Sequence, residues 1–164
     1  MPEGNREAML RALDAAGIPY RMVEHEAVHT VQAMERLHLD DGDTIPKNLF
    51  LRDARGRRHF LLVAGKDCAV DLRALRALLG TSALSFASEE RLARFLKLEK
   101  GAVTPLGVLN DEERAVEVLF EAGLTEKPVL GVHPGDNRAT VFLAFADLEA
   151  LIRAHGNRVS FVRL

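Results

Sequence analysis

The spacing of apolar residues along the chain predicts several short helices. Residues 3–16 place Met9, Leu10 and Leu13 on one side of a helix, and Gly17 follows as a typical C-terminal stop. Four further helices are expected. Three follow a capping residue: Thr30 before 31–38, Asp71 before 72–80 and Ser88 before 89–101. The last begins at Asp147 and runs to about 155.

Between these helices, alternation of apolar and polar residues predicts short strands. They are expected near 18–25, 48–53, 58–64, 83–87, 115–123, 128–132, 138–145 and 158–164. The turn sequences DARG (53–56) and HPGDN (133–137) join two pairs of them. Short, hairpin-linked strands mixed with helices indicate a mixed α/β or α+β domain with a mainly antiparallel sheet.

Composition narrows the class of protein. A chain of 164 residues, 48% of them hydrophobic, fits one domain with a real core, so we expect a single domain over 1–164. There is no run of 18 apolar residues and no signal-peptide pattern at the start, so no membrane contact is expected. The single cysteine, Cys68, predicts a reducing cytoplasm. The net charge of −2 argues against binding polyanions over the whole surface but allows a local basic patch.

Lys47 is the first candidate for chemistry. It follows Pro46 at the start of a predicted strand, in the segment PKNLFLRD, where a core-facing strand needs no cation. An ammonium is a compact charge suited to a phosphate, a carboxylate or a polarised carbonyl. A solvated lysine at a strand end explains the local sequence equally simply.

A second candidate is the segment GAVTPLGVLND, residues 101–111, in which Gly101 and Gly107 bracket Thr104 and Pro105. Glycines let the backbone approach a ligand, and exposed N–H groups can stabilise an oxygen that gains negative charge. No GKS or GKT follows, so this is not a phosphate-binding P-loop. A plain loop leading into a strand remains an alternative.

The third candidate is GVHPGDN, residues 131–137, where His133, Asp136 and Asn137 lie at a turn between strands. His133 could act as a general base or bind substrate, although the same residues are also ordinary turn formers. The six histidines form no HExxH pattern and Cys68 has no CxxC partner, so a zinc site is poorly supported.

Taken in order, the segments PKNLFLRD, LLVAGKD, GAVTPLG and GVHPGDN resemble the YbaK/prolyl-tRNA synthetase-associated editing-domain family. The resemblance covers roughly residues 20–163, and the form KNLFLRD is most similar to the free-standing ProX (PrdX) branch. It implies a trans-editing deacylase that hydrolyses the ester of mischarged tRNA(Pro), typically alanyl-tRNA(Pro). It also implies a mixed, strongly curved, partly barrel-like sheet surrounded by helices.

The resemblance also implies roles for individual residues. Lys47 matches the family's essential lysine and would hold the terminal phosphate or the ester region. The loop with Gly101, Val103, Thr104 and Pro105 would stabilise the oxyanion through its N–H groups. Substrate would be positioned by the segment that contains Gly131, His133 and Asn137. The ribose's own hydroxyl can activate water, so no metal or cofactor is expected.

Rejection of proline requires bulky apolar walls around the amino-acid pocket. Candidate walls are Met34, Leu49, Phe50 and Val103, most of which could equally be core, and for Leu49 the core is favoured. The acceptor end of tRNA could meet the basic hairpin around Arg52, Arg55, Arg57, Arg58 and His59, whereas the basic group at Arg91–Lys97 reads better as solvated surface.

Two alternatives remain open on the sequence. One is a deacylase for cysteinyl-tRNA(Pro) or for another small amino acid, because pocket volume decides between them. The other is a non-catalytic nucleic-acid-binding module, although no helix-turn-helix spacing or zinc finger supports it, and sequence-specific DNA binding is not expected. The sequence leaves open whether prolyl-tRNA synthetase is a partner.

Overall fold

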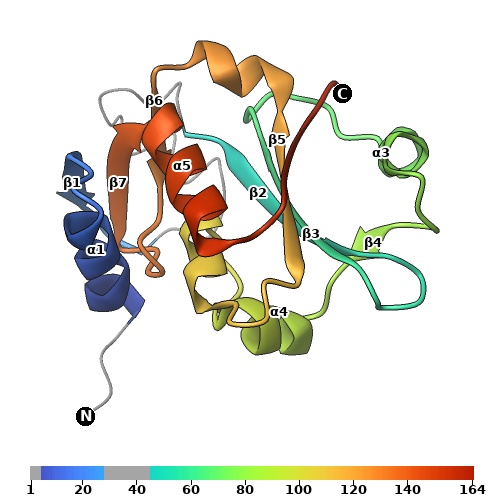
Figure 1. The fold of residues 1–164 in the computed structure, drawn as a ribbon, viewed down its shortest axis with the longest axis horizontal. Coiled ribbons are helices and arrows are strands. Elements are labelled where there is room, and N and C mark those ends of the chain that lie inside the picture. The colour runs from blue at the N-terminus through green and yellow to red at the C-terminus, as the bar shows by residue number, and fades with distance from the viewer. Residues whose placement is uncertain (1–4, 28–44) are drawn as a thin grey trace.

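The computed structural model describes residues 5–27 and 45–164, and Figure 1 shows how their helices and strands are arranged. The helices are α1 (Asn5–Ala15), α3 (Leu72–Leu79), α4 (Glu89–Leu96) and α5 (Phe145–His155), with 3₁₀ turns η2 (Pro105–Asn110) and η3 (Ala122–Glu126). The strands are β1 (Tyr20–Glu24), β2 (Lys47–Arg52), β3 (His59–Ala64), β4 (Ser85–Phe86), β5 (Val116–Glu121), β6 (Val129–Val132), β7 (Ala139–Ala144) and β8 (Val159–Val162).

The described strands form two sheets rather than one. The smaller sheet has the order β1-β7-β6, and the larger has the order β4-β2-β3-β5-β8. Four of the six strand pairings are antiparallel, while β3 with β5 and β5 with β8 run parallel. The predicted mixed α+β class with mostly antiparallel pairing is therefore confirmed, and neither sheet closes into a barrel.

Alternation along β2 and β3 divides the core in two. Phe50, Leu61 and Val63 face the smaller sheet and join one apolar cluster with Val141 and Leu143 of β7. The opposite face carries a second cluster, whose buried members are Leu51, Phe60, Leu62, Ala64, Leu75, Leu119 and Val162. Successive side chains of a strand point to opposite faces, so neighbours on β2 enter different environments.

Most predicted helix boundaries are confirmed, with two differences. The helix after Ser88 ends at Leu96 instead of near 101, because Lys97 adopts a left-handed conformation (φ 53°) and its N–H donates to Ala93. The last helix begins at Phe145, two residues before Asp147, where the Phe145 N–H donates to Pro128 (3.0 Å). The predicted helix over 31–38, with Thr30, lies outside the described residues.

Across the described parts of the chain, none of the helices combines the length and the apolar character that a membrane span requires.

Candidate active site

Lys47 is the first residue of β2, where its ammonium donates a hydrogen bond to the carbonyl oxygen of Cys68. It pairs across the sheet with Ala64, so its side chain lies on the face of β2 that packs against α3. An ammonium has three N–H donors, which leaves two after the contact with Cys68. The ammonium of Lys47 is therefore half-buried, with one of its three N–H groups bound to the protein.

The next residue, Asn48, is a candidate that the sequence analysis missed. It pairs with Val63 and therefore lies on the other face of β2, toward the smaller sheet. Its Oδ1 is buried and accepts no hydrogen bond within the described part of the chain. A buried acceptor without a donor is costly, so it marks a place where a ligand could supply one.

The loop at 101–105 has the free N–H groups that an oxyanion needs. Three N–H groups are used locally: Ala102 donates to Glu99 O (3.1 Å), Leu106 to Thr104 Oγ1 (3.3 Å) and Gly107 to Thr104 O (3.0 Å). Pro105 has none. The N–H groups of Gly101, Val103 and Thr104 donate to no acceptor among residues 5–27 and 45–164, and Gly101 takes the left-handed conformation (φ 89°).

Other predicted substrate-binding side chains are placed less favourably. Thr104 and Pro105 are buried, and the Thr104 hydroxyl caps η2 instead of facing an opening. Phe50 is 5% exposed and stacks on His59 at a ring distance of 5.7 Å, so it belongs to the core. Val103 is half-buried against the same core cluster, and Met34 lies outside the described residues.

Gly131 links β2 to β6. A Cβ atom at this glycine would lie 2.7 Å from Cε1 of Phe142 and 2.9 Å from Cγ1 of Ile45, closer than side-chain contacts allow. Ile45 stands two residues before Lys47, and His133 two residues after Gly131. The missing side chain at Gly131 therefore lets the start of β2 lie directly against the strand that leads to His133.

His133 is held as a neutral ring whose Nε2 has no hydrogen-bond partner among the described residues. Its Nδ1 lies 3.0 Å from the carbonyl oxygen of Ala139, so Nδ1 carries the hydrogen and Nε2 keeps its lone pair. Burial lowers the pKa of His133 below its usual 6.5, and the positive charge of His25 on protonation adds to this. The Ala139 carbonyl and Asp136 act in the opposite direction but are outweighed. At neutral pH, Nε2 can therefore accept a proton or a hydrogen bond.

A groove of about 780 Å³ joins the loop to the turn. Its lining includes Ala102 from the loop, Asn137 from the turn, and the cations Lys97, Lys100 and Arg138. Lys47 is not part of this lining, and its link to the turn runs through the contact of Ile45 with Gly131. The structure thus brings two of the three predicted segments onto one groove, whereas the side chain of Lys47 lies on the face of β2 opposite the smaller sheet.

The model of the aminoacyl-tRNA editing domain matches residues 25–151, which contain Lys47, the loop and the turn. The chain belongs to this family. The predicted family is confirmed, and with it an enzyme that hydrolyses aminoacyl-tRNA.

Relatives of this editing domain are found among bacteria and vertebrates. The prolyl-tRNA editing protein ProX of Acetoanaerobium sticklandii is 48% identical, over 97% of each chain. Prolyl-tRNA synthetase associated domain-containing protein 1 of Danio rerio is 33% identical, over 90% of this chain and 80% of its own length. A solved protein proposed to act in trans editing for prolyl-tRNA synthetase shares the fold, with a TM-score of 0.74, 21% identity and coverage of 100% and 99%.

The basic hairpin of this editing domain is a poor surface for phosphate. Arg58 forms a two-bonded ion pair with Glu117 (2.9 and 3.0 Å). His59 is 1% exposed and accepts a hydrogen bond from Arg91 (3.1 Å). Burial, followed by the charge of Arg91, lowers the pKa of His59 to about 4. Two members of the predicted cluster are therefore engaged within the fold, because Arg58 ties the hairpin to β5 and His59 ties it to α4.

No metal site is evident in this editing domain, as far as the described ranges extend: no three of their His, Cys, Asp and Glu residues gather as ligands would. The polar groups of the candidate site are backbone N–H groups and one ammonium as donors, and one amide oxygen and one imidazole nitrogen as acceptors.

Proposed function

We propose that the protein is a trans-editing deacylase that hydrolyses the ester of alanyl-tRNA(Pro). The observation that carries the proposal is a groove lined by Ala102 of the loop and Asn137 of the turn. On either side of Ala102 the loop has N–H groups without an acceptor among the described residues, and the turn begins at a neutral His133, although these residues are not themselves in the lining. Strong similarity to a protein named for prolyl-tRNA editing supports tRNA(Pro) as the substrate. The choice of alanine rests on the KNLFLRD segment of this sequence.

The reaction is the attack of water on the acyl carbon of the ester. A tetrahedral intermediate forms, its carbonyl oxygen gains negative charge, and the bond to the ribose oxygen breaks with transfer of a proton to that oxygen. The N–H groups of Gly101, Val103 and Thr104 are donors for the charged oxygen. One such donor is typically worth about 3 kcal/mol in the transition state.

Lys47 and His133 have different roles in this proposal. Two N–H donors of the Lys47 ammonium remain for the terminal phosphate or the ester region, while Cys68 holds the third. Nε2 of His133 accepts a hydrogen bond from the terminal ribose or from the attacking water. The free ribose hydroxyl activates the water, so His133 positions the substrate without having to remove the proton.

The acceptor end would lie along the groove. Among the described residues, the side chains of Lys97, Lys100 and Arg138 have no ion-pair or hydrogen-bond partner, so they are available to phosphates. Glu7 and Glu99 also line the groove, and the attraction is therefore local to the three cations. This fits a protein of net charge −2 that grips only the end of tRNA.

The proposed function is tested with alanyl-, cysteinyl- and prolyl-tRNA(Pro). We expect rapid loss of alanine and survival of the prolyl ester, because an editing pocket excludes the larger cognate amino acid. Ester loss is measured over time against a blank without protein. Faster hydrolysis of cysteine would support the alternative substrate, and no hydrolysis of any ester by the folded protein would overturn the proposed activity.

The reaction should depend on pH through His133. Because the pKa of His133 is lowered from 6.5, the ring is neutral at pH 7, and protonation removes the Nε2 acceptor. We expect kcat/KM to fall as the pH drops, with a midpoint below 6.5. In a His133→Asn variant the residual activity should not show this fall. A fall that persists in the variant would assign it to another group.

A further inference from the structure

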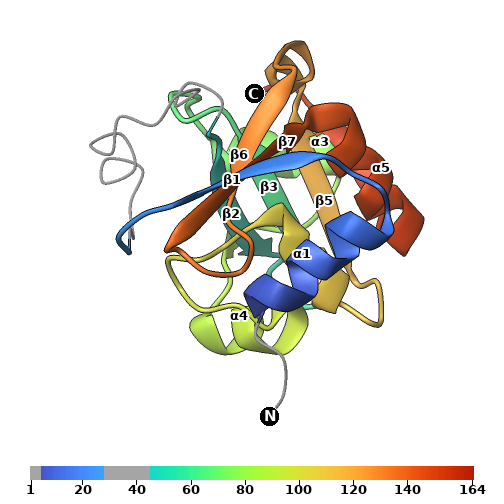
Figure 2. The same ribbon diagram turned by 90° about the vertical axis from the view of Figure 1, so that its left-hand side faces the viewer.

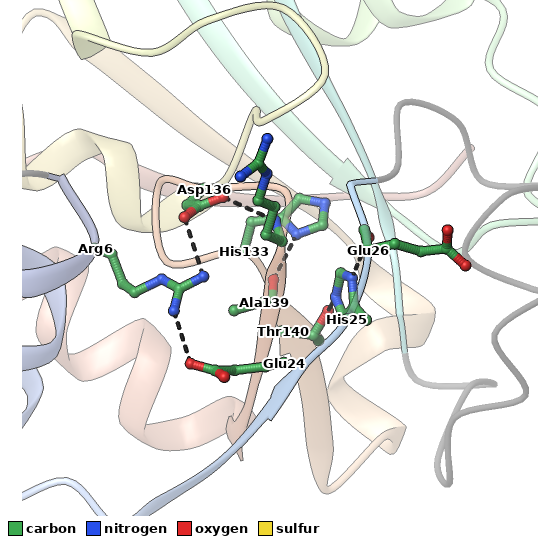
Figure 3. A network of polar contacts seen from close by, with 9 residues as sticks. Arg6, Glu24, His25, Glu26, His133, Asp136, Ala139 and Thr140 are labelled. Atoms are coloured by element: carbon green, nitrogen blue, oxygen red, sulfur yellow. Dashed lines mark hydrogen bonds and ion pairs between the residues drawn. The ribbon is translucent and has the colours of Figure 1, made fainter.

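The first turn of α1 reaches the turn that carries His133. One guanidinium, that of Arg6, joins two other elements: Nη1 lies 3.0 Å from Oε1 of Glu24 on β1, and Nη2 lies 3.0 Å from Oδ2 of Asp136 (Figure 3). The Arg6 side chain is 22% exposed. Figure 2 shows α1 next to β1, an edge strand of the smaller sheet.

Asp136 connects Arg6 to the segment that holds His133. Its second oxygen, Oδ1, accepts a hydrogen bond from the Arg138 N–H (2.8 Å) and so closes the turn. The carbonyl of the following residue, Ala139, accepts the hydrogen bond of His133 Nδ1 (3.0 Å). Both oxygens of the Asp136 carboxylate are therefore engaged, and the ring of His133 is anchored within the same short segment.

Side chains of α1 also pack directly on the backbone of this turn. Gly135 has φ +78°, and a Cβ atom there would lie 2.6 Å from Cβ of Asn5 and 3.0 Å from the sulfur of Met9. Only a residue without a side chain permits this approach. The side chains of Asn5 and Met9 therefore lie against the main chain of the turn, in addition to the ion pair.

Asn5 extends the same helix turn to the loop at 101–105. Its Nδ2 donates to the carbonyl oxygen of Lys97 (2.8 Å), four residues before the loop. Its Oδ1 accepts from Nδ2 of Asn110 (3.3 Å), which follows the loop. One helical turn thus contacts the His133 turn and the chain on both sides of the loop.

We infer that α1 is a brace for the active site and that Arg6 is a positioning residue, which sets His133 and Asn137 against the oxyanion loop. The inference rests on the proposed hydrolysis. It concerns a part of the chain that precedes the match to the family model, which begins at residue 25. Partly exposed ion pairs add little to stability, whereas a displacement of about 1 Å in a positioned group can cost roughly 100-fold in rate.

The variants Arg6→Gln and Arg6→Lys test this. We expect Arg6→Gln to lower kcat for alanyl-tRNA(Pro) about tenfold with little change in KM and melting temperature. Arg6→Lys should not restore kcat, because a compact ammonium lacks the planar fork that reaches both carboxylates. The control is Arg153→Gln, which breaks the ion pair with Glu149 on α5 (2.8 Å) and should leave kcat unchanged.

A second readout needs no tRNA. Titration of His133 by NMR should give a pKa nearer to 6.5 in Arg6→Gln than in the wild type, because a loosened turn hydrates the ring. The charged groups that face His133 are His25 on one side and Asp136 on the other, and the loss of the Arg6 charge acts in the same direction.

The two readouts separate the inference from the proposed function. A wild-type protein that hydrolyses no ester would overturn the function, and the His133 titration would still decide whether Arg6 sets the turn. If the wild type is active, an Arg6→Gln variant with unchanged kcat and an unchanged His133 titration would overturn the inference that α1 positions the active site.

Discussion

Replacing Lys47 with alanine should lower kcat/KM for alanyl-tRNA(Pro) by roughly 100-fold. The ammonium is held at the start of β2 by the Cys68 carbonyl, and its other two N–H groups have no acceptor among the described residues. A hydrogen bond to a charged group is worth about 1.5–3 kcal/mol, and each 1.4 kcal/mol corresponds to a factor of ten. Deacylation kinetics with purified variants measure this loss directly.

Two further variants make the Lys47 result specific. Lys47→Arg should remain far below wild type, because a planar guanidinium cannot hold the Cys68 carbonyl and a substrate oxygen in the same geometry. Lys127→Ala removes the same charge from an exposed site outside the groove and should leave the rate unchanged. If the Lys47→Ala protein melts at the wild-type temperature and retains full activity, Lys47 has no role in the reaction.

Local sequence signals were enough to place most of the fold. Asp71 and Ser88 cap α3 and α4 as predicted, accepting hydrogen bonds from N–H groups of the first helical turn. These motifs act within a few residues, so their spacing carries the information. The end of α4 could not be read in this way, because Lys97 takes a left-handed conformation that usually requires glycine. The division of the strands into two sheets depends on non-local pairing and was also missed.

The sequence predicted three segments of the site, which stand out locally and take their roles from the family resemblance. It indicated Lys47, the loop and the turn, and the structure brings the loop and the turn onto one groove. It did not indicate Arg6, whose two ion pairs join segments 18 and 130 positions away in sequence. It also counted Phe50 as a candidate wall, whereas packing against His59 and Phe95 makes this residue part of the core.

Asn48 had a signal that the sequence analysis could have used: it is an amide on a strand, at a position that alternation assigns to the apolar side with Phe50. Its Oδ1 is buried without a donor in the described part of the chain, at a cost of about 1–3 kcal/mol. Retaining such a group is expected where a ligand supplies the donor. The α-ammonium of the aminoacyl group and the ribose hydroxyl are both donors.

The variant Asn48→Leu should therefore change stability and activity in opposite directions. Leucine has nearly the same size and removes the unpaired acceptor, so the free energy of unfolding should rise by about 1 kcal/mol. The activity should fall at least tenfold, because the substrate donor loses its partner. Denaturant unfolding and deacylation kinetics on one preparation measure both quantities.

A second buried asparagine provides the matched comparison. Asn157 is 3% exposed, and its Nδ2 donates to Oδ2 of Asp111 (3.0 Å) and to the carbonyl oxygen of Val116 (2.9 Å). Asn157→Leu should lower the free energy of unfolding, because it leaves buried acceptors unpaired, without a selective loss of kcat. If Asn48→Leu behaves like Asn157→Leu, losing stability and keeping its rate, Asn48 is a structural amide. If Asn48→Leu instead gains stability and loses activity, Asn48 is a residue that serves the substrate at a cost in stability.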